Sequence, residues 1–164
     1  MTDKILLGFE VDNRDPPLLE LAYWAGFFDG DGCIGIYKYQ NKDSWHKSPT
    51  YSVYMALTIV DKEIIDQFAA LFLGSRATRK HRTPNSQLQY YWTARGNRAV
   101  VVLTKLLPFL RLKNPQAQLA LEFHAKKGRN PARLLTKDEL ELRETYYQRM
   151  RKINSRGKGR KKHE

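Results

Sequence analysis

Two carboxylates separated by one glycine, Asp29 and Asp31, follow an apolar stretch in the segment DGDG. The pattern predicts a helix over residues 18–28 that Gly30 and Gly32 terminate, so both carboxylates would sit at the negative end of its dipole. Anions there are disfavoured unless a cation offsets them, and carboxylate and carbonyl oxygens are the ligands that suit Mg²⁺. The segment predicts a divalent-metal site, with a Gly-rich turn shaped by the two aspartates as the alternative.

Other chemistries lack the residues they need. An EF-hand loop with Asp29 and Asp31 at its third and fifth positions would require ligands at Phe27 and Lys38. The four histidines are scattered, and Cys33 is the single cysteine, so neither a Cys-His pair nor a thiolate zinc site is predicted. One cysteine without a disulfide partner favours a reducing, intracellular compartment.

The elements around this segment follow an order of one helix and two strands, repeated. Strands are predicted over residues 33–40, 52–59, 75–82 and 87–95, and further helices over residues 61–73, 97–107, 115–125 and 137–153. Thr136 and Glu139 have the spacing of a capping box before the last helix. We expect an α+β domain over residues 18–153, in which the helices are segregated from one four-stranded antiparallel sheet. Residues 1–17 form an N-terminal extension in this scheme, and residues 154–164 a basic, disordered tail.

The charge of the chain indicates an anionic partner. Lys and Arg number 29 against 17 Asp and Glu, a net charge of +12 over 164 residues. Residues 151–164 hold seven of these cations and one Glu, so they act either as a solvated tail or as a phosphate-binding arm. Tyrosines interleave with the remaining cations, which favours nucleic acid over acidic metabolites or a membrane surface. The longest apolar run, residues 99–103, is too short to span a bilayer.

Two segments resemble a known family. Residues 24–32 (WAGFFDGDG) resemble the signature of the LAGLIDADG homing endonucleases, and residues 107–117 (LPFLRLKNPQA) resemble that family's second segment, L-P-x-L-x-x-K-x-x-Q. The resemblance implies the family's α-β-β-α-β-β-α fold, with a sheet that binds double-stranded DNA and helices on its other face. One signature in the chain implies the homodimeric branch, in which two signature helices pack across a two-fold axis. Ala22, Ala25 and Gly26 have the helical spacing for that close approach, although core packing would use the same pattern.

The resemblance also implies roles for single residues. Asp31 matches the catalytic, metal-binding aspartate, and Gly30 matches the residue whose carbonyl faces the metal, which would be Mg²⁺, with Mn²⁺ or Ca²⁺ able to occupy the same sites. Asp61 falls where relatives position water around the scissile phosphate. Lys113 matches the lysine that stabilises developing phosphate charge, whereas Asp29 matches a more structural acid.

A DNA-binding sheet would place one face in the major groove, where its side chains meet base edges. Strand alternation and the resemblance together assign these residues to that face: Gly35, Tyr37, Tyr39, Asn41, Ser52, Tyr54, Ala56, Thr58, Arg79, His81, Tyr90 and Trp92. The last two are the least determined, because Tyr90, Tyr91 and Trp92 make both faces of their strand aromatic.

The sequence thus predicts a Mg²⁺-dependent endonuclease that cuts a long, near-palindromic DNA site and leaves 3′ overhangs. The alternative is a noncatalytic nucleic-acid binder of the same fold, either an intron RNA maturase or a DNA-binding regulator. Retention of Asp31 and Lys113 favours the enzyme, because a pure binder gains little from an acid directed at phosphates.

Overall fold

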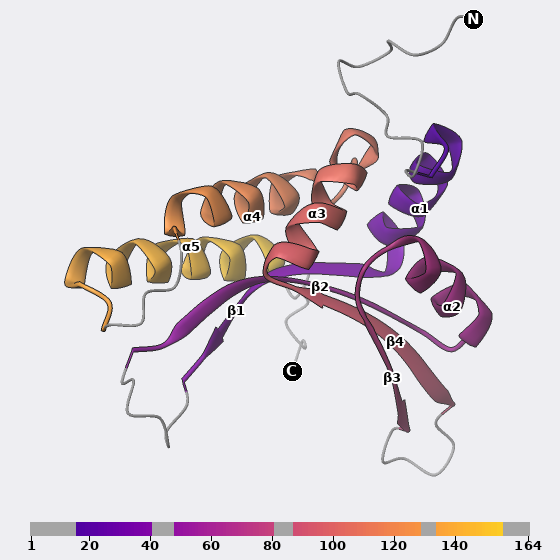
Figure 1. Ribbon diagram of the computed structural model, residues 1–164, viewed down its shortest axis with the longest axis horizontal. Helices are drawn as coiled ribbons and strands as arrows, with labels where there is room; N and C mark the ends of the chain where they lie inside the picture. The colour runs from indigo at the N-terminus through magenta and orange to yellow at the C-terminus, as the bar shows by residue number, and fades with distance from the viewer. Residues whose placement is uncertain (1–15, 41–47, 81–86, 129–133, 156–164) are drawn as a thin grey trace, which may run out of the picture.

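The computed structural model describes residues 16–40, 48–80, 87–128 and 134–155. The order of elements confirms the predicted α+β fold (Figure 1). The elements are α1 (Leu18–Asp31), β1 (Gly32–Tyr39), β2 (Thr50–Ile59), α2 (Lys62–Leu71), β3 (Ser75–Lys80), β4 (Leu88–Arg95), α3 (Asn97–Leu106), the 3₁₀ turn η1 (Leu107–Phe109), α4 (Asn114–Lys127) and α5 (Lys137–Ser155). The predicted N-terminal extension, apart from Pro16 and Pro17, lies outside the described residues, as do Asn41, His81 and the tail beyond Ser155.

The four strands form one antiparallel sheet in the order β1-β2-β4-β3. The helices lie on one side of this sheet, and the two hairpins curve away from them to leave the opposite side open (Figure 1). We call that side the open face. None of the helices in the described ranges is long and apolar enough to cross a membrane.

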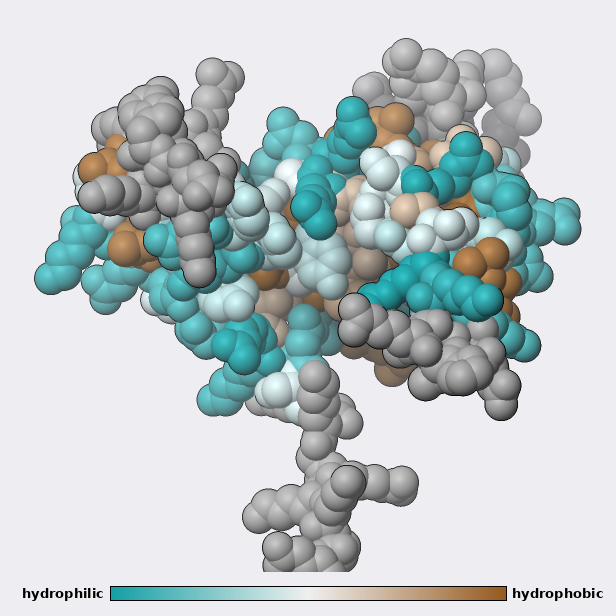
Figure 2. Space-filling view, turned by 90° about the horizontal axis from the view of Figure 1, so that it is seen from below, coloured by the Kyte–Doolittle hydropathy of each residue, from teal (hydrophilic) through white to brown (hydrophobic). Residues whose placement is uncertain are grey.

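Strict alternation along β2 determines which residues pack under the helices. Tyr51, Val53, Met55 and Leu57 are each 0% exposed, and the residues between them face the other way. Because directly paired residues of neighbouring strands share a face, β2 also fixes the faces of β1 and β4. Figure 2 looks onto the open face, whose middle is covered by hydrophilic and intermediate residues.

Helix α1 is longer than the sequence predicts, because it runs through Gly30 to Asp31 instead of ending at Phe28. Gly32 is the C-cap, and its N–H donates to the Phe28 carbonyl. Neither Gly26 nor Gly30 would bring a Cβ within 4 Å of another atom, so both are open notches on the helix surface. The extra turn places Asp31 directly before the first residue of β1.

Helix α5 covers the edge strand β1. Glu144 of α5 accepts hydrogen bonds from Lys38 at 2.7 Å and from the Tyr51 hydroxyl at 2.5 Å. Near the end of α5, the Asn154 side-chain amide donates to the Ile34 carbonyl at 3.0 Å. The helix begins at the predicted capping box, in which the Glu139 N–H donates to Thr136 Oγ1 at 3.2 Å and the Thr136 N–H donates to Glu139 at 2.8 Å.

Candidate active site and DNA-binding face

Asp29 joins the end of α1 to the segment before α4. Its carboxylate accepts backbone N–H groups from Arg111 at 2.6 Å, Leu112 at 3.1 Å and Lys113 at 2.9 Å. The residue is only 7% exposed, so these three donors supply the hydrogen bonds that a buried carboxylate requires. Asp29 is thereby engaged in structure and directed away from the open face.

Lys113 supplies the positive charge that the end of α1 requires. Its ammonium donates to the Asp29 carbonyl and lies 3.4 Å from the Gly30 carbonyl. No basic residue occurs in the last turn of α1 itself, so this cation comes from a distant segment. A lysine at freed carbonyls offsets the negative end of the helix dipole.

Asp31 differs from Asp29 in its surroundings. It is exposed at the end of α1, and among the described residues its carboxylate has no hydrogen-bond or ion-pair partner. The described ranges hold no group of three or more His, Cys, Asp or Glu residues that would enclose a metal ion by themselves. Asp31 and the Gly30 carbonyl nevertheless fit Mg²⁺, which commonly takes one or two protein oxygens and completes its shell with water and substrate phosphate.

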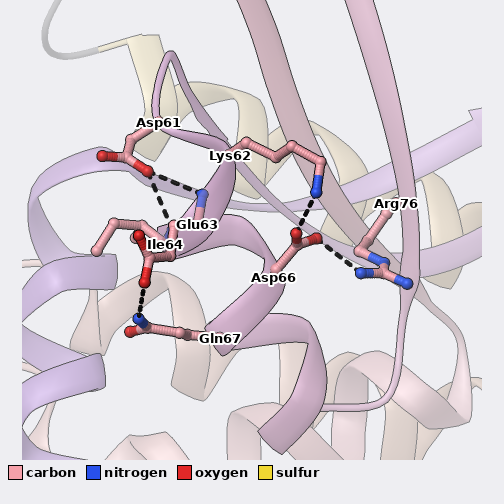
Figure 3. Close-up of polar contacts among 7 residues, drawn as sticks. All are labelled: Asp61, Lys62, Glu63, Ile64, Asp66, Gln67 and Arg76. Atoms are coloured by element: carbon pink, nitrogen blue, oxygen red, sulfur yellow. Dashed lines mark hydrogen bonds and ion pairs between the residues drawn. The ribbon is translucent and has the colours of Figure 1, made fainter.

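Asp61 lies at the same end of the sheet as Asp31, because β2 ends where its antiparallel neighbour β1 begins. One carboxylate oxygen of Asp61 caps α2 by accepting the N–H groups of Glu63 at 2.8 Å and Ile64 at 3.3 Å (Figure 3). The second oxygen points away from these donors (Figure 3). Asp61 is exposed and keeps one oxygen for a water or an ion while it holds the helix start.

Beyond Asp61, α2 is joined to the edge strand β3 by a charged cluster. Asp66 forms ion pairs with Lys62 one turn earlier and with Arg76 of β3 at 2.7 Å (Figure 3). The hydrogen bonds from Lys62 and Arg76 hold the pKa of the Asp66 carboxyl below its usual value. Arg76 is therefore committed to the helix side of the sheet.

The open face holds most of the residues that the sequence assigns to DNA. The register between strands groups Gly35 with Tyr54, Tyr37 with Ser52 and Thr58 with Tyr91. From the predicted set, the described residues on this face are Gly35, Tyr37, Tyr39, Ser52, Tyr54, Ala56, Thr58 and Arg79. Their placement leaves the DNA-binding role a prediction.

Strand β4 requires a correction. Trp92 pairs with Leu57 and Tyr90 with Ile59, so both belong to the helix side. Trp92 is 0% exposed, and its indole N–H donates to the Phe72 carbonyl at 3.3 Å. The predicted placement of Tyr90 and Trp92 on the DNA-binding face is wrong. The residues of β4 that take their place on the open face are Gln89, Tyr91, Thr93 and Arg95.

The sheet has an unusual charge pattern. The four strands contain no Asp or Glu, whereas they carry five cations, namely Lys38, Arg76, Arg79, Lys80 and Arg95. Asp31 and Asp61 lie just outside the strand ends. An anion that approaches the sheet therefore meets attractive charge along the strands, with acids only where β1 begins and β2 ends.

Tyr54 occupies the middle of the open face and leans toward β1. Its ring covers Gly35, where an added Cβ would come within 2.7 Å of it, and its hydroxyl lies 3.4 Å from Cys33 Sγ. Burial of the phenol, together with the contact to the Cys33 thiol, raises the pKa of Tyr54 to about 12. Tyr54 therefore stays a neutral phenol at physiological pH.

Helix α1 also presents an exposed apolar side. Leu19 is 87% exposed and Tyr23 56%, and they share one helical side with the notches at Gly26 and Gly30. Ala25, by contrast, is 0% exposed because it packs into the core of its own chain. The prediction that Ala25 contacts a second subunit is wrong, whereas Gly26 lies on the exposed side and Ala22 is half-buried.

Residues 24–128 match the family model described as LAGLIDADG endonuclease. The chain belongs to the LAGLIDADG endonuclease family. The matched region contains the Asp29–Lys113 contacts, Asp31, Asp61 and all four strands. The family explains why the exposed acid follows a helix and directly precedes the first strand of the sheet.

Individual relatives agree with this assignment. The chain is 33% identical over 107 residues to the DNA endonuclease I-CvuI of Chlorella vulgaris, and the match covers 63% of each sequence, which is under two thirds of that relative. A crystal structure of the homing endonuclease I-CvuI in complex with its target, in the presence of Ca, superposes with a TM-score of 0.57 and 27% identity over 66% of this chain and 68% of that one. The archaeal intron-encoded homing endonuclease I-Vdi141I, complexed with DNA, shares the fold at a TM-score of 0.65, with 15% identity and 89% of both chains covered.

Proposed function

We propose that this protein is a site-specific homing endonuclease that hydrolyses both strands of a DNA duplex. The observation that carries the proposal is the position of Asp31. Its carboxylate is exposed at the margin of a sheet whose strands carry cations and no acids. Membership of the LAGLIDADG endonuclease family supports the same conclusion.

The open face binds the duplex in this proposal. Arg79 and Arg95 attract the phosphate backbone, and the short polar side chains of Ser52, Thr58 and Thr93 reach base edges in the major groove. The helix side of the same strands is filled by the core, so the sheet keeps its curvature while the open face meets DNA. Recognition by a sheet over many base pairs gives a long target site.

The reaction takes place where α1 meets β1. Asp31 and the Gly30 carbonyl hold Mg²⁺, which when bound lowers the pKa of water and neutralises charge on the phosphate. Asp61 orients water with the carboxylate oxygen that does not cap α2. Lys113 holds a positive charge beside the Gly30 carbonyl, close to where the phosphate charge grows.

Cleavage of two strands requires two such sites, and the chain has one signature helix. The exposed side of α1, with Leu19, Tyr23 and the notches at Gly26 and Gly30, fits the α1 helix of a second copy. A two-fold axis between the helices brings two Asp31 residues together across the DNA and makes the target near-palindromic. The products carry short 3′ overhangs.

The test is cleavage of a randomised double-stranded DNA library with Mg²⁺, followed by sequencing of the ends. Asp31→Asn removes the carboxylate charge with little change of shape, and Asp138→Asn on α5 is the matched control at an exposed aspartate far from α1. We expect one near-palindromic site, cut by the native protein and the control, and bound but not cut by Asp31→Asn.

Two outcomes would contradict the proposal. Cleavage that survives Asp31→Asn would remove this residue from the chemistry. Tight binding without cleavage in any divalent metal would favour the noncatalytic binder, and structured intron RNA would then replace DNA as the substrate tested.

A further inference from the structure

One side chain of the open face that the sequence analysis missed is held in an ordered position. The Arg95 guanidinium lies over the Tyr37 ring, 4.7 Å from its centroid. Arg95 ends β4 and Tyr37 belongs to β1, so the arginine extends across the intervening strand β2. It crosses where β2 carries the small side chain of Ser52, which pairs with Tyr37.

The neighbours of Arg95 leave this path free. Tyr54, directly paired with Arg95, leans the other way onto Gly35 and toward Cys33. On its far side, the Tyr37 ring stacks on Tyr39 at 6.3 Å with an interplanar angle of 11°. Arg95, Tyr37 and Tyr39 therefore form a row of flat groups along the open face.

Stacking leaves the hydrogen-bonding edge of the guanidinium unused. No acid lies on any strand, and among the described residues Arg95 has no hydrogen-bond or ion-pair partner. The Tyr37 ring contacts the face of the guanidinium, whereas the N–H donors lie around its rim. An arginine fixed in this way loses less conformational freedom when it binds than a freely moving one.

We propose that Arg95, positioned by Tyr37, reads a guanine in each half of the DNA target. Guanine presents two acceptors, O6 and N7, in the major groove, and an arginine fork satisfies both at once. This inference rests on the proposed function, because it requires the open face to bind DNA. It adds a specificity-determining residue and the base that this residue selects.

The test is the base preference of binding, measured on a randomised duplex library in Ca²⁺ and then on single-base variants of the selected site. We expect Arg95→Ala to lose the preference for guanine at one symmetric pair of positions, with about 5- to 150-fold weaker binding to the guanine site. Arg95→Lys keeps the charge but not the fork, so it should bind with a relaxed preference at the same positions.

The role of Tyr37 is tested in the same assay. Tyr37→Phe keeps the ring and should keep the guanine preference, whereas Tyr37→Leu should weaken it. Arg76→Ala is the control for loss of an arginine, because Arg76 pairs with Asp66 on the helix side. That control should leave the base preference unchanged.

The outcomes separate the inference from the proposed function. If Arg95→Ala weakens binding to all sequences alike and lowers the salt dependence by about one unit, Arg95 is a phosphate contact and the inference is overturned. If the native protein shows no base preference at any position, the proposed function fails together with the inference. A guanine preference that survives Arg95→Ala overturns the inference alone.

Discussion

Asp29 and Lys113 hold each other through two hydrogen bonds of opposite direction. The Asp29 carboxylate accepts the Lys113 backbone N–H at 2.9 Å, and the Asp29 carbonyl accepts the Lys113 ammonium. Each residue thus uses one backbone and one side-chain group. The pair clips the end of α1, and with it Asp31, to the segment that enters α4.

Loss of the Asp29 carboxylate should unfold the clip. Asp29→Ala leaves three backbone N–H groups without their acceptor, so we expect a loss of about 3 kcal/mol or more in the free energy of unfolding. Urea denaturation of the native protein and the variant measures it, with the exposed Asp138→Ala as control. Equal stability of Asp29→Ala and the native protein would show that these hydrogen bonds contribute nothing net.

Removal of the Lys113 charge should also lower stability, but by less. Lys113→Met keeps the length of the side chain and leaves the α1 carbonyls without a cation, at a cost of about 1 kcal/mol. The exposed Lys80→Met on β3 serves as the control in the same denaturation assay. A loss of cleavage by Lys113→Met with no loss of stability would assign the lysine to chemistry alone.

Acid should loosen the contact between α5 and the sheet. Hydrogen bonds from Lys38, and then from Tyr51, lower the pKa of Glu144 from its ordinary 4.5 to about 2. A carboxyl whose pKa is lower in the folded state stabilises the fold above its unfolded pKa, and this contribution is lost as the pH falls from about 4.5 to 2. We expect the unfolding free energy of Glu144→Gln to depend less on pH over this interval, measured by denaturation at several pH values. Parallel pH curves for the two proteins would contradict this role.

The two faces of β4 can be separated by one pair of variants. Trp92→Ala empties a fully buried site and should cost about 3–5 kcal/mol in unfolding free energy. Tyr91→Ala, one residue earlier on the open face, should affect stability less and DNA binding more. Thermal melting and DNA titration of both variants distinguish the faces, and the reverse result would contradict the register.

Most of the fold follows from local patterns. The alternation of Val53, Met55, Leu57 and Ile59 predicts both faces of β2, and the strand register then places β1 correctly. The capping box at Thr136 predicts the start of α5 from two residues. These features depend on neighbours within a few positions, which the sequence displays directly.

The parts that were missed depend on distant residues. The end of α1 at Asp31 is held by Lys113 and the N–H groups before it, more than eighty residues away. In β4, the aromatic run from Tyr90 to Trp92 hides the alternation, although Gln89, Thr93 and Arg95 at spacing two do mark the polar face. Attention to those polar residues would have found the open face of β4, whereas the position of Arg95 over Tyr37 needed the order of the strands.

The contact between Asn154 and the Ile34 carbonyl also bears on what the sheet refuses to do. A sheet of four strands has two edges, and an uncovered edge can pair with a strand of another molecule. Helix α5 lies along β1 and uses one of its edge carbonyls, while the edge strand β3 carries Arg76, Arg79 and Lys80. A second copy that approached through β3 would meet three like charges. One edge is thus roofed and the other repels its own kind, which keeps the sheet at four strands in a protein that must hold its open face free.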